Sequence, residues 1–507
     1  MSEHRTSFLG AIAGAAASPG TLSDGRFVLR YADLRAHFTA LDELFGARRV
    51  ALGDVVALEC ATTVPGALTL LYLLASEFSV VLLPPPDRTA PAVEVPRFCR
   101  QRLTVRGNLA AGSQDISLQR PETFLEISDV QGHQLPPGMK AKAEGYVFLR
   151  TSGSIGHPRL AVYSHGQLLA NGLHATGRLG LDAQDRIAIP VPLSHMFGLG
   201  AAFVPGVAAG ASLRMIEAAN LLRYREHESA YLPTVAFLTP ALCATLVRPA
   251  SARAAPSAPA HYRHVVIAGD KLKPELFEAA EGRFRRVLNL YGTTEMGVVA
   301  VADARTEDGP RSMTVGPPLP GVELRLDTPE LAGELPEGAG EIVCRHPYGF
   351  EGYVEDSGEP WTGVPPLQDG WYRTRDLGRL HPGGLLEVLG REDHSVNRDG
   401  RLVLLAEIER TMEGLQGVER AVTVLGRDGL RGRRILAFCS LRDGHELDAS
   451  NLRGACASVL PSYAIPDHIV ITSTLPVLPN GKVDRRLLTV QAAAMEMSAT
   501  SPREVTI

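Results

Sequence analysis

The chain has 507 residues, which is too long for one hydrophobic core and predicts about two to four structural units. Its 51 basic and 56 acidic residues are interspersed and give a net charge of -5, which excludes the basic surface typical of nucleic-acid binding, so we expect no nucleic-acid partner. Hydrophobic residues make up 45% and charged residues 21%, which argues against extensive disorder and is typical of an α/β enzyme.

Six cysteines are widely separated and contain no Cys-x-x-Cys pair: Cys60, Cys99, Cys243, Cys344, Cys439 and Cys456. This spacing indicates neither a zinc site nor a disulfide framework, and it fits a reducing, cytoplasmic location.

The N-terminus mixes Glu3 with Arg5 before a weakly hydrophobic patch, so we expect no signal peptide. The apolar run 65–83 contains Glu77 and is followed by prolines, so we expect a helix and a buried strand there and no membrane span.

The first 300 residues alternate between strand and helix patterns. An opening strand precedes an amphipathic helix with Leu34, Phe38, Leu41 and Leu44 on one face, and "DVVALEC" follows as a strand. A helix near 66–76, a strand at 80–83 and four further apolar runs continue the pattern: "RIAIPVP", "SLRMIE", "VAFLTP" and "HVVIAG". This alternation predicts mainly parallel sheets covered by helices.

The pattern changes after about residue 316. The short runs "VELRLD", "GEIVCR" and "GGLLEVLG" predict an antiparallel or barrel-like subdomain, and "GRED" at 390–393 predicts a hinge. Beyond it, helix and strand patterns predict a small α+β unit, in which the helix of "DASNLRGACASVLP" is capped near Asp448 or Ser450. The expected fold class is therefore α/β, with a large N-terminal domain at 1–390 and a small C-terminal domain at 391–507.

A loop rich in hydroxyl and glycine residues, "TSGSIG" at 151–156, interrupts two apolar runs. Its backbone N–H groups could form an anion-binding nest, which would make it a phosphate site. It is not a Walker A motif, because no Gly-Lys-Ser/Thr follows. On local chemistry alone, a solvated turn remains an equal alternative.

Five segments in order decide between these alternatives: "LRTSGSIGHPRLAVYSH", "NLYGTTE", "YRTRDLGRL", "GREDHSVNRDG" and "LPNGKVDRRLL". Together they resemble the phosphate loop, the adenine and magnesium motif, the ribose motif, the hinge and the terminal lysine motif of the adenylate-forming enzymes. This family includes acyl- and aryl-CoA ligases and nonribosomal adenylation domains, and the resemblance covers nearly the whole chain. It implies ATP and Mg²⁺ as cofactors.

The resemblance assigns residues to the phosphates and the metal. Thr294 would touch the α-phosphate, and Glu295 would bind Mg²⁺, a hard cation that prefers oxygen ligands. The alternative for this pair is a helix N-terminus with Thr294 as its cap. The β- and γ-phosphates would be held by the loop residues Thr151, Ser152, Gly153, Ser154 and Gly156.

The same resemblance assigns the nucleoside contacts. Asn289, Tyr291 and Gly292 would surround adenine, although Tyr291 could instead be a core residue. Asp376 would accept hydrogen bonds from both ribose hydroxyls, and Arg391 would support the same sugar. The alternative for Asp376 and Arg391 is a surface ion pair.

Lys482 would be the catalytic lysine of a mobile C-terminal domain. In the family this domain delivers the lysine for adenylation and then rotates it away, and Asp393 matches the hinge position. The alternative is a solvated lysine in a polar turn.

His195 bears on the substrate. It aligns with a histidine of acyl- and aryl-ligases, whereas amino-acid-activating domains place an aspartate nearby, and no aspartate occurs between Arg186 and Ile216. The resemblance thus favours a small carboxylic acid without an α-amino group, although His195 could be only a helix-entry residue. The acid pocket is expected around His195, Ala268, Gly269, Met296 and Gly297.

Five positions depart from the family pattern. Ile155 replaces Thr, Arg159 replaces Lys and Arg375 replaces Gly, while Asn397 and Leu402 replace a Lys and an Arg that face the thiol acceptor. The last two departures weaken the case for ordinary CoA chemistry.

We therefore expect an AMP-forming acid ligase that makes an acyl-adenylate and passes the acyl group to a thiol of CoA or of a carrier protein's phosphopantetheine. The closest alternative is an amide bond synthetase with an amine or amino acid as acceptor. A third hypothesis is a catalytically silent nucleotide-binding protein, against which Lys482 argues.

Overall fold

The computed structural model describes residues 7–85, 93–106, 116–133, 145–151, 159–217, 221–247, 261–303, 312–328, 335, 337–355, 368–392, 395–398, 401–429, 432–478 and 483–498. The chain divides into two compact units. The first comprises Met1–Leu324, Cys344–Tyr372 and Pro382–Leu386, and the second comprises Arg325–Val343, Arg373–His381 and Glu387–Ile507. The domain boundary expected at residues 390 and 391 stays a proposal.

An eight-stranded sheet forms one half of the first unit, in the order β14-β13-β12-β11-β9-β10-β1-β2. Its strands are β1 (Thr21–Ser23), β2 (Val28–Arg30), β9 (Arg186–Ile189), β10 (Ser212–Met215), β11 (Val235–Leu238), β12 (His264–Ile267), β13 (Val287–Thr293) and β14 (Gly297–Val301). All neighbours pair in parallel except at the two edges, β13 with β14 and β1 with β2. This confirms the parallel sheet that the repeated apolar runs predict.

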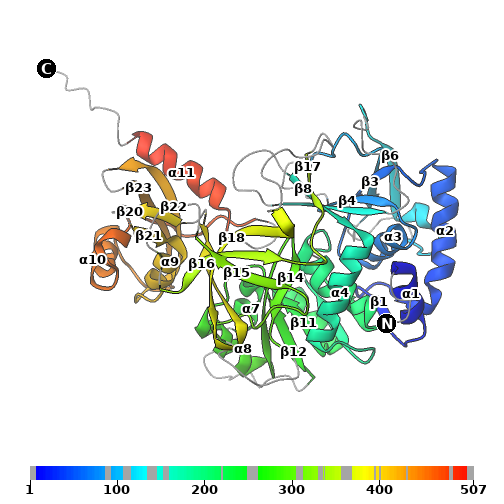
Figure 1. Ribbon diagram of the computed structural model, residues 1–507, viewed down its shortest axis with the longest axis horizontal. Helices are drawn as coiled ribbons and strands as arrows, with labels where there is room; N and C mark the ends of the chain where they lie inside the picture. Colours follow the sequence, from blue (N-terminus) through cyan, green and yellow to red (C-terminus); the bar gives the residue numbers. More distant parts are fainter. Residues whose placement is uncertain are drawn as a thin grey trace. The chain divides into compact units, whose positions relative to one another are not determined.

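Helices cover one face of this sheet (Figure 1). They are α6 (Leu221–Tyr231), α7 (Pro240–Val247) and α8 (Pro274–Arg283). Tyr224, Cys243 and Phe277 from these helices pack in one cluster with Val265 and Ile267 of β12. The strands of a parallel sheet are buried on both faces, which explains why their sequences are continuous apolar runs.

A seven-stranded sheet forms the other half of the first unit, in the order β17-β8-β7-β4-β3-β5-β6. Its strands are β3 (Val55–Glu59), β4 (Ser79–Leu83), β5 (Gln101–Val105), β6 (Leu125–Asp129), β7 (Tyr146–Arg150), β8 (Arg159–Ser164) and β17 (Gly352–Glu355). β3, β4, β5 and β7 pair in parallel, whereas β8 returns antiparallel to β7 and carries β17 on its outer edge. The loop 151–158 therefore joins two adjacent strands of a hairpin.

The remaining helices of the first unit are α1 (Phe8–Ala16), α2 (Leu34–Ala47), α3 (Val64–Ala75), α4 (His165–Leu179) and α5 (Val204–Ala208). Three of them begin after a residue whose side chain caps them, namely Ser7, Thr63 and Ser164. Ser164 and Gln167 form a capping box at α4, which satisfies backbone N–H groups that the helix cannot. In α2 the deepest residues are Leu34, Leu41 and Phe45, so the buried face extends to a phenylalanine that the predicted stripe omitted.

A four-stranded sheet takes the place of the expected barrel-like subdomain. Its order is β15-β16-β18-β19, with β15 (Glu323–Asp327), β16 (Ala339–Arg345), β18 (Trp371–His381) and β19 (Leu385–Arg391). β15 and β19 are its outer strands, so over the described strands this sheet is open and forms no closed barrel.

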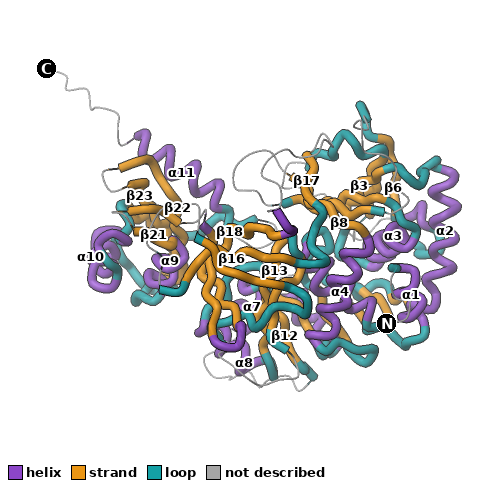
Figure 2. The backbone as a smooth tube through the Cα atoms, in the orientation of Figure 1, coloured by secondary structure: helices purple, strands orange, loops and turns teal. Residues whose placement is uncertain are grey.

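The C-terminal part of the second unit is a small α+β structure (Figure 2). Its strands form a hairpin, β20 (Ser395–Arg398) with β21 (Arg401–Leu404), and a three-stranded sheet of β22 (Val418–Gly429), β23 (Gly432–Leu441) and β24 (His468–Ile471). Its helices are α9 (Leu405–Glu413), α10 (Ala449–Val459), which the Asp448 side chain caps, and α11 (Arg485–Ser498).

Alternation along β23 places helices on both faces of this sheet. Ile435, Ala437 and Cys439 pack against α9 and α10, whereas Leu436 and Phe438 pack against α11. Because successive strand residues point to opposite faces and both faces are covered, the run "ILAFC" at 435–439 is apolar throughout. In the described part of the chain, no helix is long and apolar enough to cross a membrane.

Arg375 lies in β18 with a backbone φ of +58°, a conformation that glycine adopts without steric cost. The glycine that the resemblance places at this position would adopt this conformation without strain. Its backbone N–H donates to the buried Glu341 carboxylate over 3.1 Å, which helps to hold the strained conformation.

We predict that Arg375→Gly is more stable than Arg375→Ala by about 1 kcal/mol, because only the alanine has a Cβ that opposes the left-handed conformation. Urea unfolding measures the difference. The same two substitutions at Arg379, which lies in the same strand without a positive φ, should have the opposite order. Equal stabilities at position 375 would contradict the prediction.

Three histidines should make stability depend on pH: His165 and His264 are buried, and His346 is partly buried. Burial lowers the pKa of His165 to about 4, of His264 to about 3 and of His346 to about 4. Between those values and 6.5 the unfolded chain binds more protons than the folded chain, so the free energy of unfolding falls as the pH falls through this window.

We predict that each histidine contributes up to about 1.4 kcal/mol per pH unit to this loss. His264→Gln should therefore reduce the pH dependence of the unfolding free energy between pH 5 and 6.5. Denaturant unfolding at several pH values measures it, and an unchanged slope in the variant would refute the assignment.

Candidate active site

Segments predicted to form the acid pocket, together with the predicted adenine contact Asn289, lie at the carboxyl ends of neighbouring strands of the eight-stranded sheet. His195 follows β9, Ala268 and Gly269 follow β12, and Asn289 lies in β13 opposite Ile267. β9, β11, β12 and β13 are consecutive in the sheet. In open parallel sheets this edge is where ligands bind. The structure therefore brings these predicted residues to one edge of one sheet.

His195 enters a helical segment of unusual geometry. Its side chain is exposed, and its backbone carbonyl accepts from Leu199 N–H at 2.9 Å. The next residues, Phe197–Phe203, form a π-helix, η4, which continues into α5. π-Helical turns are rare in proteins overall, and those that occur often lie at functional sites. The sequence analysis did not predict this element, because apolar periodicity does not distinguish a π-turn from an α-helix.

Thr294, Glu295 and Met296 form the turn of the β13–β14 hairpin. The alternative of a helix N-terminus at Thr294 is therefore wrong. Thr293 Oγ1 accepts from the Met296 N–H at 3.0 Å within the turn.

Residues in or beside the seven-stranded sheet donate hydrogen bonds to the backbone of this turn. The Tyr163 hydroxyl, on β8, donates to the Thr294 carbonyl at 2.9 Å, and the Phe350 N–H donates to the Glu295 carbonyl at 2.8 Å. Each contact comes from the segments around the seven-stranded sheet, so the turn is pinned between the two halves of the first unit.

The Glu295 carboxylate is partly buried and is held by a tyrosine pair. Tyr353 donates to its Oε1 at 2.7 Å, and the Tyr372 hydroxyl lies 2.9 Å from that of Tyr353. Among the described residues, Glu295 has no basic partner, and no group of three or more His, Cys, Asp or Glu side chains could hold a metal ion. A single uncompensated carboxylate fits a Mg²⁺ ion whose other ligands are phosphate oxygens and water.

Asn171 of α4 binds both ends of the segment that follows Glu295. Its amide donates to the Met296 carbonyl at 3.1 Å and accepts from the Val298 N–H at 3.1 Å. Between them Gly297 has a φ of +65°, and a Cβ there would lie 2.6 Å from Asn171 Oδ1. Only glycine fits this position without displacing the amide.

His346 completes this clamp as a neutral ring. Its Nδ1 accepts from the Tyr348 N–H, so the proton lies on Nε2, which donates to the Val298 carbonyl at 3.0 Å. Burial lowers the pKa of His346 to about 4, which agrees with the neutral form.

Only some of the first-unit residues that were predicted to bind the nucleotide lie in the described part of the chain. Asn289 is partly buried, Tyr291 is buried and Gly292 is exposed at the end of β13. Thr151 closes the β7–β8 hairpin, its N–H donating to the Arg159 carbonyl at 2.9 Å. The predicted residues Ser152, Gly153, Ser154, Gly156, Asp393 and Lys482 lie outside the described residues.

The two predicted ribose residues lie together in the second unit. Asp376 of β18 is 7% exposed, and its Oδ1 lies 3.6 Å from Arg391 Nη1 at the end of β19. The ion pair of the alternative interpretation is thus present, but the carboxylate is buried rather than on the surface. A ribose-binding role for both residues stays a prediction.

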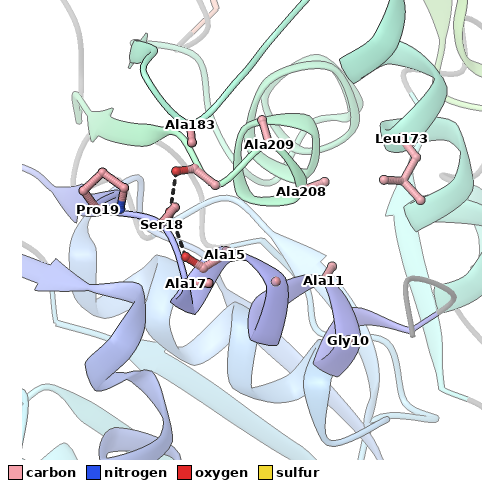
Figure 3. Close-up of a pocket in the computed structure, with 12 residues that line it drawn as sticks. Gly10, Ala11, Ala15, Ala17, Ser18, Pro19, Leu173, Ala183, Ala208 and Ala209 are labelled. Carbon is pink, nitrogen blue, oxygen red and sulfur yellow. Dashed lines mark hydrogen bonds between the residues drawn. The ribbon is translucent and has the colours of Figure 1, made fainter. Parts of the chain in front are cut away.

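A pocket of about 320 Å³ lies elsewhere in the first unit, and none of the predicted site residues lines it (Figure 3). Its walls are mostly alanine and glycine from α1, α5 and the adjoining turns, and Ser18 in it donates to the carbonyls of Ala15 and Gly210 at 2.7 Å. We therefore place the candidate active site at the sheet edge and not in this pocket.

The sequence analysis missed the side chains that hold the site: Tyr163, Asn171, His346, Tyr353 and Tyr372. These residues come from β8, α4, the segment after β16, β17 and β18, and only the folding together of these parts makes them neighbours. A polar residue within an apolar helix face, as at Asn171, was the one available signal.

The chain matches known families over most of its length. A family model of the AMP-binding enzymes matches residues 69–354, and one of the AMP-binding enzyme C-terminal domain matches residues 407–482. A salicylyl-CoA synthase / salicylate adenylyltransferase of Streptomyces sp is 28% identical over 353 residues, which are 68% of this chain. The match spans 62% of that relative, less than two thirds of its length.

Solved structures share the fold. ATP-bound MatB from Rhodopseudomonas palustris superposes with a TM-score of 0.76 at 20% identity, covering 95% of this chain and 98% of MatB. The amide bond synthetase McbA from Marinactinospora thermotolerans gives a TM-score of 0.71 at 22% identity, covering 95% of this chain and 99% of McbA. Because two ordered family models cover most of the chain, this protein belongs to the AMP-binding enzymes, the adenylate-forming superfamily of AMP-forming acid ligases.

Proposed function

We propose that the chain is an ATP-dependent carboxylic acid ligase that forms an acyl-adenylate and pyrophosphate and then transfers the acyl group to a thiol of CoA or of a carrier protein. The single observation behind this proposal is the Glu295 turn. A carboxylate that has no basic partner among the described residues is fixed at the carboxyl edge of the parallel sheet, inside the segment that matches the AMP-binding family.

The first step requires charge neutralisation more than acid–base catalysis. The substrate carboxylate attacks the α-phosphorus of ATP, the bond to the β-phosphate oxygen breaks, and pyrophosphate leaves with its negative charge. Mg²⁺, when bound through Glu295 and the phosphates, would neutralise that charge. We propose that residues 151–156 hold the leaving phosphates and that Lys482 places a positive charge beside the reacting oxygens.

The acid substrate is a small carboxylic acid without an α-amino group. Between Arg186 and Ile216 the chain has no aspartate that could bind an ammonium group, and the exposed His195 occupies the β9 loop instead. The salicylate-activating relative supports an acid of this class. The wall provided by Met296 and Gly297 is rigid because Asn171 holds both of its ends.

An amine acceptor is the second candidate function. Asn397 and Leu402, where the family has Lys and Arg, are register partners across the β20–β21 hairpin, so both departures fall at one place in the small domain. Loss of two positive charges at one place weakens recognition of the phosphates of CoA. The fold likeness to an amide bond synthetase is compatible with this candidate.

We predict acid-dependent exchange of pyrophosphate into ATP when the wild-type chain is assayed with aromatic, alicyclic and medium-chain acids. Lys482→Ala should reduce this exchange at least about a hundredfold, because the transition-state charge loses its cation. Transfer from preformed acyl-adenylate should remain within about threefold of wild type, since the lysine is withdrawn in that step. Equal loss of both half-reactions would contradict the lysine's role, and no exchange with any acid would refute the ligase function.

We predict a thioester as the product when CoA, a carrier protein bearing phosphopantetheine, and free amines are each offered with ATP and the active acid. Mass spectrometry identifies the product of each reaction. Formation of an amide without any thiol would replace the leading function with the amide synthetase alternative.

A further inference from the structure

Two carboxylates of the first unit are held by the same arrangement of tyrosines. Tyr353 donates to Glu295 Oε1 at 2.7 Å, with the Tyr372 hydroxyl 2.9 Å behind it. Tyr262 donates to Glu228 Oε1 at 2.8 Å, with the Tyr224 hydroxyl 2.8 Å behind it. The group around Glu228 can therefore be compared, within the same chain, with the group around Glu295, the carboxylate expected to bind the metal.

The two arrangements differ in charge. Arg283 donates to both oxygens of Glu228, at 2.9 and 2.7 Å, and both side chains are at most 10% exposed. Glu295 has no such cation among the described residues. Burying a carboxylate is costly unless a positive charge compensates it. The Glu228 group is therefore neutralised within the chain, whereas the partly buried Glu295 carboxylate has no compensating cation among the described residues and can accept a bound one.

The hydrogen-bond directions leave one oxygen of Glu295 open to a cation. An ionised carboxylate only accepts, so Tyr353 uses its one hydroxyl proton on Oε1. The Tyr372 hydroxyl must then donate to Tyr353. Neither Tyr353 nor Tyr372 donates a hydrogen bond to Oε2 of Glu295.

Tyr353 is itself fixed by the strand that follows the phosphate loop. It lies opposite Ala161 in the β17–β8 pairing, and the Arg159 guanidinium carbon lies 5.8 Å from the centre of its ring. The Phe350 ring packs edge-on against it with centroids 4.8 Å apart. The direction of the Glu295 carboxylate is thus coupled, through Tyr353, to β8, which begins at Arg159.

We propose that Tyr353, supported by Tyr372, is a positioning residue that orients the Glu295 carboxylate for Mg²⁺ bound with ATP. Its hydroxyl occupies one carboxylate oxygen and presents the other to the metal. This inference rests on the proposed function, because it assumes that Mg·ATP binds at Glu295.

The test measures ATP binding by calorimetry without any acid substrate, so no turnover is involved. Mg²⁺ is expected to raise the affinity for ATP, and a titration gives the Mg²⁺ concentration at which half of this gain is reached. In Tyr353→Phe this concentration should rise about tenfold, because the variant loses one charge-assisted hydrogen bond to the carboxylate. ATP affinity measured in EDTA should stay unchanged. Tyr372→Phe should shift the Mg²⁺ response in the same direction by a smaller factor, and it keeps the test valid if Tyr353→Phe does not fold.

Tyr262→Phe is the matched control, because it removes the same hydroxyl from the same tyrosine–tyrosine–carboxylate arrangement beside Arg283. It should lower thermal stability and leave the Mg²⁺ response unchanged. The inference is overturned if Tyr353→Phe and Tyr372→Phe have a wild-type Mg²⁺ response, or if metal-free ATP affinity falls by the same factor. A wild-type chain whose ATP affinity ignores Mg²⁺ would instead refute the proposed function.

Discussion

The site depends on one hairpin turn that two sheets hold in common. The turn belongs to the eight-stranded sheet, yet Tyr163 and Tyr353 of the seven-stranded sheet bind its backbone and its carboxylate. A three-residue turn has few internal hydrogen bonds, so outside partners must fix it. If either sheet moved relative to the turn, the Glu295 carboxylate would change direction. The packing of the two sheets thus determines the geometry of the chemistry.

Buried polar groups around the turn are satisfied in pairs rather than singly. Asn171 uses both ends of its amide on the backbone of Met296 and Val298, and the neutral His346 binds the carbonyl of Val298. An unpaired polar group in this interior would cost free energy, so the pairing favours one conformation of the segment. The rigidity of the expected pocket wall follows from these contacts and from the glycine between them.

Charge distinguishes the two carboxylates that tyrosine pairs hold. Glu228 and Arg283 neutralise each other among helices that cover the sheet, where their role is structural. Glu295 accepts from Tyr353 and, in the part of the chain that the structure describes, has no cationic partner at the edge where parallel strands end. The same residue types therefore serve stability in one place and, on our proposal, metal binding in another.

The sequence by itself determined the strands and helices, because apolar runs and periodic faces reflect local burial. The parallel runs and the cap at Asp448 were predicted from neighbouring residues, whereas His195, Ala268 and Asn289, which gather at one sheet edge, were predicted as site residues from the resemblance to the family. Local patterns did not predict the turn at Thr294, the π-helix after His195 or the open form of the four-stranded sheet, because each depends on partners distant in the sequence. Only the tertiary structure decided which tyrosines hold Glu295 and that no arginine pairs with it within the described residues, since hydrogen bonds between separate elements leave no periodic trace in the chain.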